Sequence, residues 1–426
     1  MTQRFANIER LLRSDRKGHT LPQQLYVGQE AFEFDTQVLL PSVWLFACTV
    51  AHIKRPGDWF RFDMADNSVI VVRGKDGEVR AFFNSCRHRG ARLCEAAQGH
   101  APRLICPYHQ WTYQLDGSLI GARNMGPDFD KSLHGLTPVA LENVGGLLFI
   151  CLGDNPPDLG QVKTDITAQI GVFDLEHCKV AVQDELIESA NWKLVMENNR
   201  ECYHCDANHP ELVSCLGNSG FGKGLPEDGN ADAKAAAHIA AKREEWQALG
   251  IDHDLIEFPG HWWHRLARLA LADGKVSQTL DGKVASQKLL GPFKEPETSS
   301  LSIWTEPNNW NHFCCDHVLT FSLTPLAADR PTPWRPIRAR NLHPRPTSGF
   351  AAMADRKVMP RAEPKISGAI QSGRHRREKK PNSAGGGWNS PNDWSKARRS
   401  RSSSSMERSA ELGSISISGT RPIPRT

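Results

Sequence analysis

Two short pairs of cysteine and histidine constrain this chain more than any other feature of its sequence. One residue separates Cys86 from His88, two separate Cys106 from His109, and 17 residues lie between the pairs. A [2Fe–2S] cluster with mixed ligands needs two thiolates on one iron and two imidazoles on the other. Because each pair offers one of each, two loops can supply this set from opposite sides. The spacing therefore predicts a [2Fe–2S] cluster held by these four side chains.

A zinc site is the main alternative for these four residues. Zinc-binding pairs usually place two to four residues between their ligands, and the Cys86–His88 pair is tighter than that. We therefore favour the cluster, whose neutral imidazole ligands raise its reduction potential above that of an all-cysteine cluster. Cys94 belongs to neither pair, and we expect it to be a packed thiol.

Strand-like segments around the pairs predict a small all-β domain over residues 42–155. The segments are rich in β-branched and aromatic residues, and the turn signals KDG and LDG separate some of them. They are SVIVVRG, EVRAFFNS, RLICPYHQWTY and GGLLFICL. Before this domain, residues 1–41 predict a helical lead-in, because Ile8, Leu11 and Leu12 have helical spacing.

Residues 175–330 predict a second domain that combines helices with an antiparallel sheet. We expect one helix from Asn191 through His204 and another over residues 230–250, which are rich in alanine and charge. The expected strands are KVAVQDELIES, KVSQTLDGK, SSLSIWTE and HVLTFSLTPL. The predicted fold class is thus α+β, with an all-β domain followed by an antiparallel sheet with helices.

A second group of potential metal ligands lies near the predicted helix that begins at Asn191. The run NWKLVMENNRECYHCDANHPEL contains Glu197, Glu201, His204 and His209. On a regular helix the first three fall on one narrow stripe, and the fourth can join them only if the helix ends or distorts. Two histidines beside carboxylates suit a non-haem Fe(II) centre, which leaves positions open for O₂ and substrate. A solvated helix face with surface histidines is the alternative.

The net charge of +4 conceals two parts of opposite charge. Residues 331–426 carry 20 Lys and Arg against 6 Asp and Glu (+14), whereas the rest of the chain carries 32 against 42 (−10). The hydrophobic pattern is also lost after Arg330, and this composition predicts a disordered basic tail of low complexity. We favour the hypothesis that the tail translates a shifted reading frame. A native extension that binds nucleic acid is the alternative.

Composition also bears on compartment and partners. No run of about 18 apolar residues occurs, so we expect no membrane partner. The first 20 residues are charged and amphipathic and lack the apolar stretch of a secretory signal. The 11 cysteines lie among histidines rather than at regular intervals, which indicates metal chemistry before disulfides. We therefore expect a cytoplasmic protein, and we expect no nucleic-acid partner.

The two motifs, in this order, resemble those of the α subunits of Rieske non-haem iron oxygenases. The resemblance covers about residues 20–330 and rests on Cys-x-His…Cys-x-x-His followed by Glu-x3-Glu-x2-His-x4-His. It implies a Rieske domain and a helix-grip catalytic domain, usually assembled as a head-to-tail homotrimer. It also implies that electrons pass from NAD(P)H through a flavin/iron–sulfur reductase to the cluster, and then to the iron of the neighbouring subunit.

Carried over position by position, the resemblance assigns six side chains to two metal sites. The cluster would be held by Cys86, His88, Cys106 and His109, and the catalytic iron by His204 and His209. Glu201 would bridge a cluster histidine and an iron histidine, because a carboxylate at this position can accept a hydrogen bond from the free N–H of a ligand imidazole.

Glutamate rather than aspartate at position 201 resembles the subgroup that acts on quaternary ammonium compounds such as glycine betaine. The resemblance implies hydroxylation of an N-methyl carbon with O₂, which gives the demethylated amine and formaldehyde. A permanent cation binds well over aromatic faces. Trp262, Trp263, Trp304 and Trp310 can supply such faces. We select Trp263, Trp304 and Trp310 as candidate substrate residues, with simple burial in the core as the alternative.

The sequence departs from this family where the third iron ligand is expected. The family supplies a carboxylate from a late helix, usually within an Asn/Gln-Asp-Arg context. Here that region is basic and has no regular hydrophobic pattern. The Asp-Arg pair near its start is Asp355-Arg356. We therefore take Asp355 as the candidate third ligand. Two alternative functions follow: an aromatic-ring-hydroxylating dioxygenase α subunit, or a catalytically defective Rieske electron-transfer protein that lacks this ligand.

Overall fold

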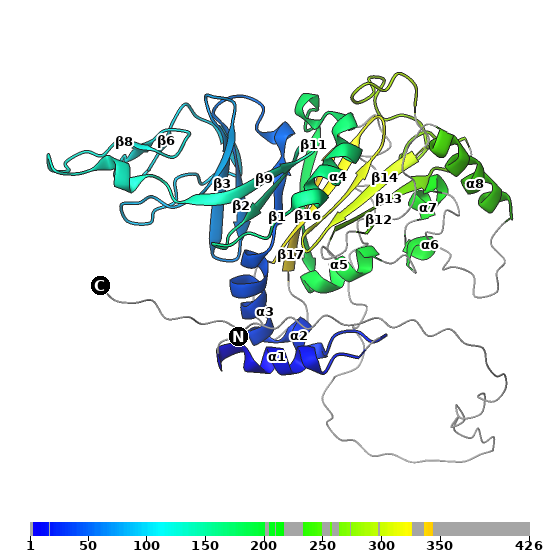
Figure 1. Cartoon of the computed structure of the whole chain (residues 1–426), viewed down its shortest axis with the longest axis horizontal. Helices are drawn as coiled ribbons and strands as arrows, with labels where there is room; N and C mark the ends of the chain where they lie inside the picture. Colours follow the sequence, from blue (N-terminus) through cyan, green and yellow to red (C-terminus); the bar gives the residue numbers. More distant parts are fainter. Residues whose placement is uncertain are drawn as a thin grey trace, which may run out of the picture. The chain divides into compact units, whose positions relative to one another are not determined.

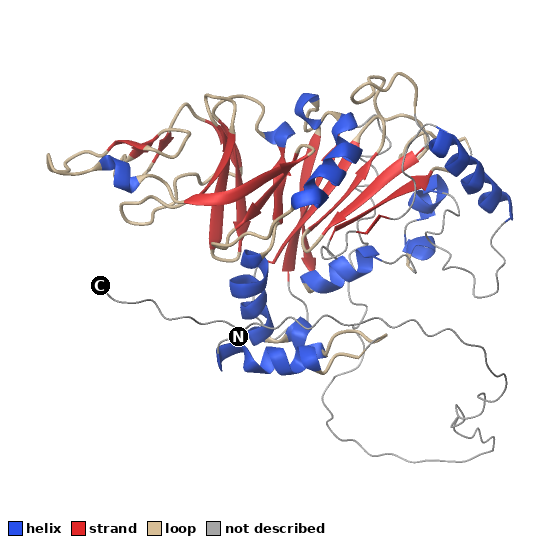
Figure 2. Cartoon of the chain, in the orientation of Figure 1, coloured by secondary structure: helices blue, strands red, loops and turns tan. Residues whose placement is uncertain are grey.

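The computed structural model describes residues 3–16, 18–200, 204–208, 210–216, 233–248, 256–257, 264–272, 274–296, 299–325 and 336–343. Within these ranges the chain forms two seven-stranded sheets and one three-stranded sheet (Figure 1). Helices lie at the start of the chain, and further helices lie between residues 160 and 248 (Figure 2). The predicted fold class is confirmed, because an all-β region precedes an α+β region.

The described chain begins with a short helical segment. Its helices are α1 (Ala6–Arg13), α2 (Gln23–Val27) and α3 (Gln29–Phe34), followed by a π-helical turn over Asp35–Leu39. Of the three residues that predict the first helix, Ile8 and Leu11 are buried, whereas Leu12 is 42% exposed. The two buried side chains belong to a small core shared by all three helices.

The first large sheet has the strand order β1-β10-β9-β4-β3-β2-β5, and its strands pair antiparallel. Three of the predicted strands, SVIVVRG, EVRAFFNS and GGLLFICL, are confirmed as β3, β4 and β10. The KDG turn ends on Gly77, whose φ of +85° favours glycine. The strands are β1 (Leu45–Thr49), β2 (Asp58–Met64), β3 (Asn67–Arg73), β4 (Val79–Phe83), β5 (Gln98–His100), β9 (Pro138–Val144) and β10 (Leu147–Cys151).

The three-stranded sheet consists of β6 (Leu104–Ile105), β7 (Thr112–Tyr113) and β8 (Leu119–Gly121). RLICPYHQWTY, which we expected to be one strand, is therefore two short strands joined by a loop. The prediction is wrong because Cys106 and Trp111 hydrogen-bond to each other through their backbones, which closes the loop between them. This loop contains one Cys–His pair, and the loop between β4 and β5 contains the other.

The second large sheet has the order β11-β17-β16-β15-β14-β13-β12 and is antiparallel. KVSQTLDGK, which we expected to be a strand, is a turn in which Asp281 accepts hydrogen bonds from Lys283 N–H (3.0 Å) and the Thr279 hydroxyl (3.1 Å). The strands are β11 (Val182–Ser189), β12 (Ile256–Glu257), β13 (His264–Ala270), β14 (Ser299–Thr305), β15 (Asn309–Phe313), β16 (Val318–Pro325) and β17 (Pro336–His343).

Strand β17 corrects the predicted start of the disordered tail at residue 331. It pairs with β11 on one side and with β16 on the other. Hydropathy did not indicate a strand here, because the segment PIRARNLH is short and basic. The register runs from Val182 opposite His343 to Ser189 opposite Pro336. The sheet therefore continues beyond the point where the sequence pattern predicted the domain to end.

The remaining described helices belong to the α+β region or lead into it. They are α4 (Gly160–Ile170), α5 (Trp192–Arg200), α6 (Cys205–Asn208), α7 (Pro210–Leu216) and α8 (Ala233–Ala248). The predicted helix over residues 230–250 is confirmed as α8. The predicted continuous helix through His204 is wrong, because α5 ends at Arg200 and His204 lies in a turn. None of the described helices is long and apolar enough to cross a membrane.

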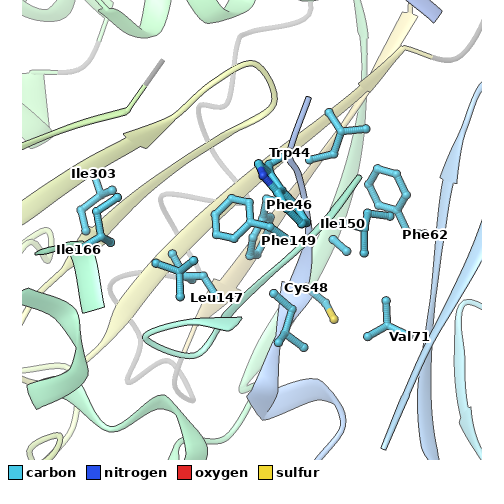
Figure 3. Close-up of a cluster of buried hydrophobic side chains, with 14 of the residues drawn as sticks. Trp44, Phe46, Cys48, Phe62, Val71, Leu147, Phe149, Ile150, Ile166 and Ile303 are labelled. Carbon is cyan, nitrogen blue, oxygen red and sulfur yellow. The ribbon is translucent and has the colours of Figure 1, made fainter. Parts of the chain in front are cut away.

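A shared hydrophobic core joins the two large sheets. Figure 3 shows Phe46 and Phe149 of the first sheet in the same buried cluster as Ile166 of α4 and Ile303 of β14. Asn308 adds a polar link, because its side-chain amide accepts from Phe46 N–H (2.9 Å) and donates to the Phe46 carbonyl (3.1 Å). The first sheet and the second thus share one buried core.

Candidate functional site

The two loops that contain the Cys–His pairs have matching backbone geometry. In the first loop, the Cys86 N–H donates to the carbonyl five residues on (2.8 Å), and the Cys86 carbonyl accepts from Gly90 N–H (2.8 Å). In the second loop the same two bonds at Cys106 measure 2.8 and 3.0 Å, the latter from Gln110 N–H. Gly90 and Gln110 both have left-handed φ angles, +72° and +61°. Each loop therefore turns back on its cysteine in the same way.

The structure brings the four predicted cluster ligands together. The rings of His88 and His109 lie 4.7 Å apart between centroids. Burial raises the pKa of Cys86, and the nearby Cys106 thiol raises it further. Cys86 and Cys106 are 3% and 1% exposed, whereas His88 is half-buried and His109 is exposed. The thiols thus lie inside the domain and the imidazoles lie toward its surface.

The residues present fit a cluster with two thiolate and two imidazole ligands. Nδ1 of His88 is buried and has no hydrogen-bond partner among the described residues. A buried polar atom of this kind costs free energy unless something binds it. Burial opposes ionisation of the Cys86 thiol, and coordination by iron reverses this effect because a coordinating thiol is deprotonated. The role of the four side chains as ligands stays a prediction that these observations support.

Aromatic residues around the pairs were not identified from the sequence as part of the site. The Tyr113 hydroxyl lies 3.3 Å from Cys86 Sγ and accepts a hydrogen bond from Arg87 N–H (3.1 Å). Either group can donate while Cys86 is a thiol, but a thiolate that holds iron has no proton and can only accept, so the Tyr113 hydroxyl would donate to the sulfur of a bound cluster. Trp111 stacks on His88 with ring centroids 4.9 Å apart. The sequence feature that could have identified them is their position, because Trp111 and Tyr113 both lie within seven residues of Cys106.

Cys94 is a packed thiol, as we expected. It is 7% exposed, and burial raises its pKa to about 12. The neighbouring backbone is held by Asn84, whose side chain accepts from Leu93 N–H and Cys94 N–H (2.9 Å each) and donates to the Cys94 carbonyl (2.8 Å). Asn84 therefore fixes the end of the loop that begins at Cys86.

The predicted iron ligands lie only partly within the described residues. His204 is half-buried, and its Nε2 atom lies 3.4 Å from Nδ2 of Asn198 on α5. Glu201 and His209 lie outside the described residues, and so do Asp355 and Trp263. The structure therefore places His204 beside the end of α5, and its role as an iron ligand stays a prediction, as do the roles of the other four residues.

Helix α5 is held at its first turn by the N-terminal segment. Asn191 caps the helix by accepting from Lys193 N–H (2.9 Å), and it donates to the Tyr26 carbonyl (2.7 Å). The buried Asp35 carboxylate forms an ion pair with Lys193 and accepts from the Trp192 indole N–H (3.0 Å). These contacts position the helix that leads to His204.

Helix α5 is held at its last turn by the second sheet. Arg200 Nε lies 3.0 Å from Glu306 Oε1, and the Trp304 indole N–H donates to Asn199 Oδ1 (2.8 Å). Burial raises the pKa of Glu306, although Arg200 and Arg265 oppose that shift. Both ends of α5 are thus tied to other elements, which limits how far this helix can move.

Trp304 and Trp310, two of the candidate substrate residues, are neighbours across β14 and β15. They are 4% and 8% exposed. The Arg265 guanidinium lies 4.6 Å from the Trp304 ring centroid, and Phe321 stacks on Trp310 at 4.8 Å. One face of each indole is therefore already covered, so a ligand could use only the opposite face. Their role in substrate binding stays a prediction.

A further cluster of potential ligands lies beside the β15–β16 turn. Ligand atoms of Cys314, Asp316 and His317 lie within 4.8 Å of one another, and all three residues are buried. The Asp316 carboxylate already accepts from the Ser277 hydroxyl (2.9 Å to each oxygen) and from Ala285 N–H (2.5 Å), and it lies 3.0 Å from His317 Nδ1. Because its oxygens are already used, this carboxylate ties the loop over residues 274–286 to the turn.

Two protein families match this chain. The Rieske [2Fe-2S] domain family matches residues 43–140, and the Ring hydroxylating alpha subunit (catalytic domain) family matches residues 175–356. A glycine betaine monooxygenase oxygenase subunit of Pseudomonas aeruginosa is 41% identical over 323 residues, which cover 75% of this chain and 73% of the relative. The carnitine monooxygenase oxygenase subunit of Escherichia coli (strain K12) is 32% identical over 215 residues, which cover 48% of this chain and 56% of the relative.

Solved structures share this fold. A quaternary ammonium Rieske monooxygenase aligns with a TM-score of 0.54 at 21% identity, covering 76% of this chain and 75% of that one. Naphthalene 1,2-dioxygenase from Rhodococcus sp. aligns with a TM-score of 0.55 at 21% identity, covering 79% and 76%. The two matched families imply a [2Fe–2S] cluster and a mononuclear iron. The chain belongs to the Rieske-type non-haem iron oxygenases, as a subunit that joins a Rieske domain to a ring-hydroxylating catalytic domain.

Proposed function

We propose that this chain hydroxylates an N-methyl group of a quaternary ammonium compound of the glycine betaine type. One observation carries the substrate class: the 41% identity to glycine betaine monooxygenase oxygenase subunits extends over 323 residues of this chain. A second such subunit, from Chromohalobacter salexigens, is 40% identical over 321 residues. Oxygenase subunits of this family use O₂ and need a reductase partner.

Four side chains would hold the cluster, and the cluster would supply one-electron transfer. Cys86 and Cys106 would hold one iron through thiolates inside the domain, and His88 and His109 would hold the other through imidazoles nearer the surface. This arrangement suits electron transfer, because the histidine side is the one that a partner can approach. Glu201 bridges one of these histidines and an iron-bound histidine of a neighbouring subunit in a homotrimer.

His204 and His209 would hold the catalytic iron, with Asp355 as the third ligand. A non-haem iron with two imidazoles and a carboxylate supplies open positions for O₂. Contacts among the described residues support the proposed role of His204 in this centre. Contacts at both ends of α5 fix its position, and Asn198 orients the His204 ring from that helix. The catalytic domain in this proposal spans residues 175–330 together with β17.

The substrate cation binds over aromatic faces. Trp263, Trp304 and Trp310 are the proposed residues, and a guanidinium already lies over one face of Trp304. That face is occupied by the protein's own cation, so the substrate would use the opposite face of the ring. Aromatic faces hold a trimethylammonium group without the hydrogen bonds that this group cannot make.

The proposed reaction balances as a two-electron monooxygenation. One oxygen atom of O₂ is inserted into a C–H bond of an N-methyl group, and the other leaves as water with two protons. NAD(P)H supplies the two electrons through a flavin/iron–sulfur reductase in the cytoplasm. The N-hydroxymethyl ammonium product then loses formaldehyde: the C–N bond breaks, its electron pair stays on nitrogen, and the hydroxyl proton passes to solvent.

Aerobic turnover of the full chain with a reductase tests this function. We expect formaldehyde from glycine betaine, carnitine or choline, and no formaldehyde from any of the three would overturn the proposal. Iron content separates an active centre from a defective one, since about three irons per chain indicate both sites and about two indicate the cluster alone.

A second candidate function is hydroxylation of an aromatic ring. It is favoured by the 33% identity over 192 residues to a 2-aminobenzenesulfonate 2,3-dioxygenase subunit alpha. The same assay decides between the two. O₂ uptake with arenes and none with N-methyl substrates would support the second function.

A further inference from the structure

Ser302 and His312 form a polar pair on the face of the second large sheet that also carries Trp304 and Trp310. The register places Ser302 opposite His312 and Trp304 opposite Trp310, and side chains two residues apart on a strand point to the same face. From this face Trp304 donates to Asn199 of α5. The pair therefore lies on the sheet face turned toward the helix that leads into the iron-binding motif.

The contact between the two residues determines which nitrogen of His312 carries the proton. The Ser302 hydroxyl is fully buried and lies 2.9 Å from His312 Nδ1. Among the described residues, the imidazole is the only hydrogen-bond partner of this hydroxyl. A buried O–H without an acceptor is costly, so the hydroxyl donates to Nδ1. The neutral ring then carries its proton on Nε2.

His312 is neutral at physiological pH. Burial lowers its pKa to about 4, and the nearby His317 acts in the same direction. The residue as a whole is nevertheless only half-buried, so part of it is open to solvent. A neutral imidazole does not repel a trimethylammonium group, whereas an imidazolium would. Its Nε2–H is still a donor for an anion in a site of low dielectric constant.

We propose that His312 is a specificity-determining residue that donates a hydrogen bond from Nε2–H to the carboxylate of a betaine substrate. This inference rests on the proposed function and names its substrate class, zwitterions with a carboxylate near the quaternary ammonium group. Trp310 lies two residues away along β15, a rise of about 6.8 Å. An aromatic face and a donor can thus bind the two ends of one short molecule. Choline, which has a hydroxyl in place of the carboxylate, lacks the charge that strengthens such a bond.

Isothermal titration calorimetry of the full chain with glycine betaine and with choline tests the proposal. His312→Phe removes the donor and keeps a ring, whereas His312→Gln restores an N–H at a similar reach. We expect His312→Phe to weaken glycine betaine binding by about tenfold or more and choline binding by less than about twofold. His312→Gln should recover most of the loss. Ser302→Ala should show a smaller selective loss, because it frees the tautomer. Ser300→Ala is the matched control, since Ser300 is a buried serine on the same face of β14.

Two kinds of binding result would overturn the inference. They differ in whether the proposed function is overturned with it. Equal losses for both ligands, or no change with His312→Phe, would leave the proposed function intact and remove the role of His312. Wild-type chain that binds neither ligand would remove the proposed function and this inference with it. Long-range ¹⁵N NMR of histidine-labelled chain gives an independent readout: the signal absent from His312→Phe should show the Nε2-protonated tautomer and shift with glycine betaine.

Discussion

The Tyr26 hydroxyl donates a 2.8 Å hydrogen bond to Glu197 Oε1, which joins residues 171 positions apart in the sequence. Tyr26 belongs to the N-terminal helical segment and Glu197 to α5. Glu197 falls on the stripe that the sequence associates with iron, but the structure shows it bound to this tyrosine. The contact therefore helps to hold the helix that precedes His204, a predicted iron ligand.

Tyr26→Phe should change the alkaline limb of the stability profile. Burial, followed by the bond to Glu197, raises the pKa of Tyr26 from its ordinary value of 10.0 to about 12. Between these values the unfolded chain has lost a proton that the folded chain retains. Stability that is present below pH 10 is therefore lost as the pH rises toward 12, by up to about 2–3 kcal/mol for this group. Urea unfolding of wild type and variant between pH 9 and pH 12 should show a shallower loss for Tyr26→Phe.

Tyr108→Phe is the matched control for this measurement. Tyr108 is 61% exposed, so its removal should leave the alkaline slope unchanged. The same slope in wild type and in Tyr26→Phe would contradict the prediction.

Asp35→Asn should destabilise the chain through its buried ion pair. The Asp35 side chain is 4% exposed and that of its partner Lys193 is 14% exposed. Removing one charge leaves the other buried without compensation, which costs about 3–5 kcal/mol. The free energy of unfolding from urea titration, followed by tryptophan fluorescence, should fall by an amount of this order.

Two variants check the cause of that loss. Asp154→Asn, at an exposed position, should stay within about 0.5 kcal/mol of wild type. The double variant Asp35→Asn/Lys193→Met should recover part of the loss, because it leaves no unpaired charge. A double variant less stable than Asp35→Asn would show that the ion pair is not the cause.

Tyr113→Phe should lower the reduction potential of the cluster. A Cys86 thiolate bound to iron can only accept, so the Tyr113 hydroxyl 3.3 Å away would donate to it, and hydrogen bonds to cluster sulfurs favour the reduced state because they stabilise added negative charge. A bond worth about 1 kcal/mol corresponds to a shift of about 40 mV for one electron. Redox titration followed by visible absorption measures the shift, and an unchanged or higher potential would refute the role of Tyr113.

Cys86→Ala and Cys94→Ala should separate ligand from packed thiol. Both residues are buried cysteines in the same hydrophobic cluster, so each substitution removes one sulfur from similar surroundings. Cys86→Ala should lose about two irons and the acid-labile sulfide per chain, whereas Cys94→Ala should keep both. The measurement is iron and sulfide content after anaerobic reconstitution. Full cluster content in Cys86→Ala would exclude that cysteine as a ligand.

Local patterns predicted the fold class and three of the seven strands of the first sheet. SVIVVRG and GGLLFICL became β3 and β10, because β-branched and aromatic runs between turns pair readily. The same rule did not work for RLICPYHQWTY and KVSQTLDGK, since backbone and side-chain hydrogen bonds close turns inside them. It also missed β17, whose basic composition conceals a strand that the neighbouring edges of β11 and β16 select.

The sequence alone indicated the four cluster ligands through their spacing, since ligands one or two residues apart are kept close by the backbone itself. They are Cys86, His88, Cys106 and His109. That the two pairs meet, with rings 4.7 Å apart, was decided by the folding of the small sheet. The support of Cys86 by Tyr113, 27 residues away, and the tautomer of His312 set by Ser302 on the adjacent strand were also decided there. Such contacts depend on strand register and on the packing of whole elements, which no local pattern encodes.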